Sequence, residues 1–214
     1  MTRKNSRGNS ALEFALLLPF MTTLLLGTIG AGFGLLHNLE VIQLARDTAR
    51  LYAKQAQNIN FALQGTQDIL VTLAGDLGLQ QTASGTTPNV FGTAGTGTAV
   101  VYVSEVLYLG QNLCPNGTAS CANYEHWVFA QRVVIGNPSV DSSHFGSPSA
   151  SIINSTNGTI TTANYENNAT AIANMTGVAA LPTGAYLYVA EATGPGVSVP
   201  GFWNSPKVYS YAIF

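Results

Sequence analysis

Charged residues are scarce in this sequence. They make up 8% of its 214 residues, against roughly 25% in ordinary soluble domains. The formal net charge is −2, so the chain lacks the strongly basic balance of proteins that bind nucleic acid. We therefore expect no nucleic-acid partner.

The sequence also lacks motifs for catalysis or metal binding. Its three histidines, His37, His126 and His144, are scattered, and none has HExxH or another metal-ligand spacing. A GxSxG nucleophile motif and a phosphate-binding loop are missing as well. We therefore expect neither an enzyme nor a bound metal or cofactor. The carboxyl-terminal part also contains four glutamates, Glu105, Glu125, Glu166 and Glu191. Nothing in their spacing indicates that they come together.

What the sequence does contain is one long run without charge. Residues 14–36 read FALLLPFMTTLLLGTIGAGFGLL, 23 residues in all, and as a helix they would span roughly 34 Å, enough for a hydrocarbon core of about 30 Å. Glycines in its second half favour close approach of a neighbouring helix, and Pro19 removes one helical hydrogen bond. The run is long for a cleaved secretory signal and lacks a small-x-small cleavage site. A retained membrane anchor is therefore expected.

Basic residues flank this run on both sides, so the positive-inside rule gives nearly a tie. They are Arg3, Lys4 and Arg7 before it, and Arg46, Arg50 and Lys54 after it. The polar Asn/Thr-rich body and a cysteine pair favour export of the carboxyl-terminal part. We expect the amino end in the cytoplasm and residues 37–214 outside.

The only two cysteines, Cys114 and Cys121, lie in the stretch CPNGTASC. A Pro-Asn-Gly turn signal between them brings the thiols close, and outside the cytosol such a pair oxidises. The disulfide would stabilise the fold by about 2.5 kcal/mol through chain entropy. The alternative is two free buried thiols in a reducing cytosol. A zinc site would need more ligands than His126 adds.

The helix is expected to continue beyond the membrane. Apolar residues recur there at helical spacing, namely Leu35, Leu39, Ile42, Ala49, Tyr52, Ala53 and Ala56. Arg46, Arg50 and Lys54 form a basic stripe at i, i+4 and i+8. This stripe is either a solvated face or a contact with an acidic neighbour in an assembly.

The remaining chain predicts a mixed domain. A second helix is expected at 59–79, a loop at 82–97 and a short helix at 163–175. β-Branched and aromatic runs predict four strands, the first two as a hairpin around the cysteine loop, at 98–110, 126–136, 184–193 and 207–214. The expected fold class is α+β, with a long amino-terminal transmembrane helix continuing into an antiparallel β-sheet domain.

A carboxylate, Glu13, stands at the head of the apolar run. Charge in a membrane segment is costly and is usually paired or functional. The alternative is that Glu13 lies at the membrane interface and has no specific role. The surrounding residues, RGNSALEFALLLP at 7–19, resemble a class III signal, which prepilin peptidases cut after the glycine. Cleavage between Gly8 and Asn9 would make Glu13 the fifth residue of the mature chain, where pilins and pseudopilins carry a glutamate.

Together with LARDTARLYA at 44–53, this start resembles the TadE-like family of tight-adherence (Flp) minor pseudopilins. Members show an EFAL-x-LP start and a helix that ends in an A-A-R-x-G-A-R-like stretch. Thr48 stands where a glycine is common. The resemblance covers residues 7–53, and it implies assembly roles for Glu13, Phe14 and Pro19, with Arg46 and Arg50 as helix-face contacts.

The resemblance also implies an organisation and a set of partners. Residues 1–8 would be a cytoplasmic leader, 9–57 a transmembrane and assembly helix, and 58–214 a periplasmic or extracellular α+β domain of a bacterial inner-membrane protein. The implied partners are a prepilin peptidase, other pilins and pseudopilins, an inner-membrane assembly platform and membrane lipid, with no cofactor. The alternative is a bitopic inner-membrane protein whose periplasmic domain binds a ligand or protein without polymerising.

Overall fold

The structure is a computed structural model of the chain. It describes residues 7–55, 98–154, 158–179, 184–196, 198–199, 203–204 and 207–214. The helix expected at 59–79 and the loop expected at 82–97 lie outside the described residues. Contacts divide the chain into two units, residues 1–39 with 196–206 and residues 40–195 with 207–214.

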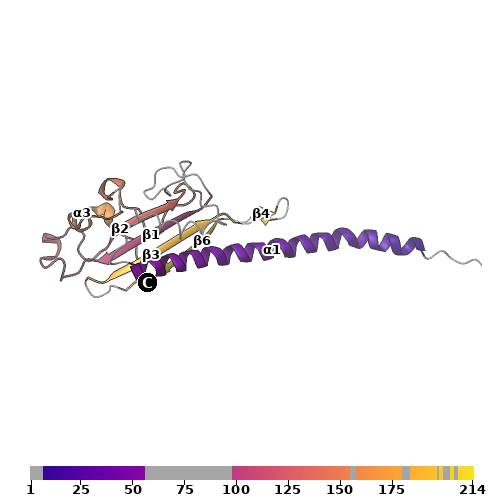
Figure 1. Cartoon of the computed structure of the whole chain (residues 1–214), viewed down its shortest axis with the longest axis horizontal. Coiled ribbons are helices and arrows are strands. Elements are labelled where there is room, and N and C mark those ends of the chain that lie inside the picture. The colour runs from indigo at the N-terminus through magenta and orange to yellow at the C-terminus, as the bar shows by residue number, and fades with distance from the viewer. Residues whose placement is uncertain are drawn as a thin grey trace, which may run out of the picture. The chain divides into compact units, whose positions relative to one another are not determined.

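A single helix, α1, runs from Arg7 to Gln55 and contains Pro19 (Figure 1). The long amino-terminal helix is thereby confirmed. In the first unit its large apolar side chains, from Leu12 to Leu39, are 46–73% exposed. This unit also contains a small antiparallel pair of strands, β4 (Ser198–Val199) and β5 (Trp203–Asn204).

The second unit is built on a four-stranded antiparallel sheet with strand order β2-β1-β3-β6 (Figure 1). Its strands are β1 (Val100–Tyr108), β2 (Trp127–Gly136), β3 (Tyr186–Gly194) and β6 (Val208–Ile213). All four predicted strands are confirmed, and β1 and β2 form the predicted hairpin. The α+β fold class is therefore correct.

One face of this sheet packs against the second part of α1. Val41, Leu44 and Ala45 lie in one buried cluster with residues of β1, β2 and β3. Leu35 and Leu39 of the predicted apolar repeat are 66% and 53% exposed. At 100° per residue these two leucines share a helix face with the exposed Arg46.

The opposite face of the sheet is covered by the segments that connect β2 to β3. Val106, Phe129 and Val189 are buried there against Ile152, Ile160, Ala171, Ala173 and Met175. These segments contain η3 (Ala150–Ile152), α3 (Thr162–Asn167) and η4 (Ala169–Ala171). The helix predicted at 163–175 is therefore wrong beyond Asn167. Asn168 has an extended backbone, and its side chain accepts a hydrogen bond from the Thr170 N–H at 2.9 Å, which starts a separate turn.

Candidate functional site on the amino-terminal helix

The exposed half of α1 has the composition of a membrane span. The stretch Leu12–Arg50 reaches a mean hydropathy of 1.9 in its most apolar window, none of which is buried. Among the described helices it alone is long and apolar enough to cross a membrane. In water such a surface would be costly, at about 25 cal/mol per Å² of apolar area.

The threonine hydroxyls within this half are satisfied by the helix itself. The hydroxyl of Thr22 donates to the carbonyls of Leu18 and Pro19, each at 3.0 Å. The hydroxyl of Thr28 donates to the carbonyl of Leu25 at 2.8 Å. These bonds leave no threonine donor to be desolvated in hydrocarbon, where an unpaired polar group is expensive.

The residues of the expected processing and assembly motif lie in the first turns of α1. The helix begins at Arg7, so Gly8 and Asn9 have helical backbone. Glu13 is exposed, as is Phe14 at 66%. Among the residues that the structure describes, none forms an ion pair with Glu13.

The residues of the second motif, the stretch at 44–53, lie on two different faces of α1. Ala45, Thr48 and Ala49 are buried, with exposed fractions of 0%, 2% and 0%. Arg46 and Arg50 are exposed. Small side chains on the buried face let the helix lie close to its neighbours. Thr48 is less favourable on this face than glycine or alanine would be. Among the described residues, its buried hydroxyl has no hydrogen-bond partner.

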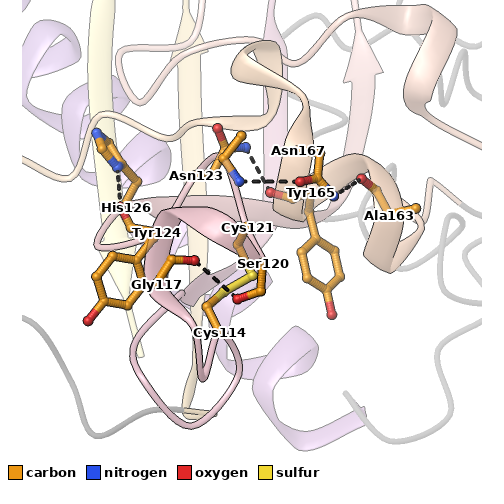
Figure 2. The surroundings of a disulfide bond; sticks show 11 residues. Cys114, Gly117, Ser120, Cys121, Asn123, Tyr124, His126, Ala163, Tyr165 and Asn167 are labelled. Atoms are coloured by element: carbon orange, nitrogen blue, oxygen red, sulfur yellow. Dashed lines mark hydrogen bonds between the residues drawn. A yellow bond between two sulfur atoms is a disulfide. The ribbon is translucent and has the colours of Figure 1, made fainter.

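The predicted disulfide is present in the second unit (Figure 2). Cys114 and Cys121 are bonded, with their Cα atoms 5.7 Å apart, and both are buried. The turn between them includes η2 (Gly117–Ala119). Gly117 has a φ of +58°, which residues other than glycine rarely adopt.

Asn123 fastens this loop to α3 (Figure 2). Its side-chain Nδ2 donates to the carbonyls of Tyr165 and Asn168 at 2.9 and 2.8 Å, and its backbone N–H donates to Glu166 at 2.8 Å. The residue is only 2% exposed. Sequence reasoning missed Asn123, since a single asparagine in an Asn-rich chain carries no signal of burial.

A buried polar network lies on the sheet face opposite α1. Arg132 on β2 and Glu191 on β3 are 2% and 1% exposed, and Arg132 Nη1 lies 3.6 Å from Glu191 Oε2. The guanidinium also donates to Ser104 Oγ, and to the carbonyl of Gly146 at 3.2 Å. The carboxylate accepts from the hydroxyl of Ser143, from the His144 N–H at 2.8 Å and from the Tyr209 hydroxyl at 2.9 Å.

Burial governs the ionisation of this network. Desolvation lowers the pKa of Arg132 to about 10, and the neighbouring Glu191 carboxylate opposes that change. Burial, followed by the negative charge of Glu191, raises the pKa of Tyr209. The His144 ring stacks on Tyr209 with centroids 3.9 Å apart. Since Glu191 is already bonded to four protein groups, the network fastens the segment from Ser143 to Gly146 to the sheet.

The structure pairs Glu191 with Arg132 and not with another carboxylate. In the described part of the chain, no three His, Cys, Asp or Glu residues come together as metal ligands would. The network and the disulfide each connect segments of the second unit to one another. The exposed amino-terminal half of α1 is the candidate functional surface.

A long exposed apolar helix thus continues into an antiparallel α+β domain. Residues 8–50 match the model of a family described as TadE-like protein, the family that the sequence resembles. The match spans the motif around Glu13 and the Arg46–Arg50 stretch. No curated protein and no solved structure matches the chain.

Proposed function

We propose that this chain is a minor pseudopilin of a tight-adherence (Flp-type) pilus or a related secretion system. The observation that carries the proposal is the family match at residues 8–50, because it falls on the helix whose apolar side chains are exposed. A structural role without catalysis agrees with this family. The size of the outer domain favours a minor, tip or priming subunit over a shaft subunit.

Processing precedes assembly in this proposal. The leader, residues 1–8, remains in the cytoplasm, and a prepilin peptidase cuts between Gly8 and Asn9. The mature protein then has an assembly helix at 9–57, anchored in the inner membrane, and an α+β domain at 58–214 on the periplasmic side. The disulfide supports this orientation, since disulfides persist in oxidising compartments.

Glu13 sets the axial register of packed subunits. Cleavage creates a cationic amine on Asn9, and the carboxylate of Glu13 on a neighbouring subunit neutralises it. In a low-dielectric helix bundle this attraction is strong and an unpaired charge is heavily penalised. The exposed and unpaired state of Glu13 within the described chain supports this role.

The remaining motif residues shape the packed helix. Phe14 offers an exposed aromatic surface to a neighbouring helix, and Pro19 locally removes a backbone hydrogen bond. Arg46 and Arg50 lie exposed beyond the apolar run, where they contact acidic groups of adjacent pilins or pseudopilins. The inner-membrane platform extracts the subunit from lipid into the pilus or onto its tip.

Mass spectrometry of the mature amino terminus, on protein purified from native membranes, tests the proposal. A chain that begins at Asn9 is expected. An intact leader in cells with an active prepilin peptidase would instead support a bitopic protein that does not polymerise. The variants Glu13→Gln and Glu13→Asp add a matched pair, because only the second keeps the charge. We expect Glu13→Gln to abolish incorporation into pili and Glu13→Asp to retain part of it.

A further inference from the structure

The two edge strands of the four-stranded sheet, β2 and β6, differ in whether their outward backbone groups are hydrogen-bonded within the described residues. On the outer side of β2, the N–H of Arg132 donates to the carbonyl of Gly158 at 2.9 Å. The N–H of Ile160 donates to the carbonyl of Ala130 at 2.8 Å. The chain therefore covers its own β2 edge with the segment that follows Gly158.

The β6 edge is open. Tyr188 and Phe214 exchange two backbone hydrogen bonds at 2.8 and 2.9 Å, and antiparallel pairs alternate between bonded and non-bonded positions. Ser210 and Ala212 consequently direct their backbone groups toward β3. The N–H and C=O groups of Tyr209, Tyr211 and Ile213 are directed away from it. No strand in the described residues pairs with that outer side.

In the part of the chain that the structure describes, this edge has none of the usual protection against pairing. Natural edge strands are blunted by charged residues, proline or bulges. Residues 208–214 read VYSYAIF, without charge, proline or glycine, and the register of β3 with β6 is regular. Tyr211 and Phe214 are 55% and 45% exposed. The nearest charge, Lys207, is engaged with the carbonyl of Val140.

We propose that β6 pairs antiparallel with β6 of a second copy of this chain, with Tyr211 on the two-fold axis. The outward backbone groups at Tyr209, Tyr211 and Ile213 are symmetric about Tyr211. In the pair, Tyr209 lies opposite Ile213 of the second copy, and Tyr211 lies opposite Tyr211. Each outward N–H then meets an outward C=O, and the two sheets join into one of eight strands through a self-complementary contact.

The side chains favour a second copy over an unrelated strand. On one face the pair stacks Tyr211 on Tyr211 between Tyr209 and Ile213, and aromatic cross-strand pairs are favourable. On the other face Ser210 lies opposite Ala212, and Val208 opposite Phe214. No like charges face each other in this register. A strand rich in charge would satisfy the backbone but would place that charge against aromatic residues.

Cross-linking of the full chain in detergent-solubilised membranes tests the contact. Tyr211→Cys introduces one free thiol, because Cys114 and Cys121 are bonded to each other. Tyr186→Cys is the matched control, since Tyr186 is 44% exposed on β3 and lies outside the register with β6. A short bismaleimide is expected to give a covalent dimer of Tyr211→Cys and no dimer of Tyr186→Cys. Equal dimer from both variants would overturn the proposal.

A charge exchange at the two-fold axis distinguishes this contact from helix association in the detergent micelle. Two differently tagged copies are mixed and co-purified. Tyr211→Lys and Tyr211→Glu, each alone, are expected to lower co-purification at least about fivefold, because like charges then face each other. A mixture of the two variants is expected to restore it. Undiminished pairing of the single variants, or failure of the mixture, would overturn pairing through β6. Circular dichroism of each charged variant checks its fold independently.

Discussion

Arg132 and Glu191 form an ion pair that reaches across a strand. Arg132 is on β2 and Glu191 on β3, and β1 lies between them in the sheet. The guanidinium carbon lies 4.5 Å from the centroid of the Tyr102 ring, which belongs to β1. Both charges are almost fully buried, so each depends on the other for compensation.

Removing one charge of this pair is expected to destabilise the fold strongly. Glu191→Gln leaves the Arg132 guanidinium buried without a counter-charge, and the free energy of unfolding should fall by about 3 to 5 kcal/mol. Denaturant unfolding of the full chain in detergent, followed by circular dichroism, measures the change. Arg132→Met with Glu191→Gln should recover part of the loss. A loss below about 1 kcal/mol in the single variant would contradict a compensated buried pair.

Gly158 is expected to tolerate no side chain. Its φ is +75°, and a Cβ there would lie 2.5 Å from the carbonyl oxygen of Arg132. Gly158→Ala should therefore lower the free energy of unfolding by more than about 2 kcal/mol, through strain and separation from β2. Gly177→Ala is the matched control, because Gly177 has a φ of +86° but open space around it. Equal losses of unfolding free energy in the two variants would mean that backbone strain alone destabilises Gly158→Ala, and that the contact with Arg132 adds nothing.

Thr48 offers a stabilising substitution. Its hydroxyl is buried without a partner, and an unsatisfied buried donor costs about 1 to 3 kcal/mol. Thr48→Val replaces that hydroxyl with a methyl group of similar shape, and thermal unfolding should show a gain of about 1 kcal/mol. Thr48→Ser keeps the hydroxyl and removes the methyl group, so it should destabilise. A destabilised valine variant would indicate that the hydroxyl is bonded in solution.

Local patterns predicted much of this fold. The uncharged run at 14–36 and the β-branched strands carry their structure in short periodic stretches, and the turn between Cys114 and Cys121 brings the two thiols together. These features depend on neighbours close in the sequence. The motif around Glu13 was likewise visible in the sequence, since it lies within thirteen consecutive residues, 7–19.

Features that depend on distant residues were not predictable. Arg132 and Glu191 were only two charges in the sequence until the antiparallel register brought them to one sheet face. The buried face of α1 depends on where the sheet lies, so helical spacing alone did not show that Val41, Leu44 and Ala45 are its buried residues. Asn123 is buried only because α3 supplies its acceptors.

Glu105 on β1 predicts a pH dependence of stability. The side chain is half-buried and lies opposite Tyr188 in the β1–β3 register. Burial raises the pKa of Glu105 from 4.5 to about 7. Between these values the folded chain binds more protons than the unfolded chain, so this contribution to stability is complete below pH 4.5 and is lost as the pH rises through about 7.

Glu105→Gln isolates this effect, because glutamine keeps the shape and does not ionise. The variant should unfold with a flatter pH profile between pH 4.5 and about 7, and at about pH 8 it should be more stable than the natural chain. After allowance for solvent screening at a partly exposed site, we expect a gain of about 1 to 2 kcal/mol. Glu125→Gln, at an exposed position, should leave the profile unchanged. An unaltered slope in Glu105→Gln would mean that Glu105 ionises at its ordinary pKa, with its carboxylate solvated in the folded state.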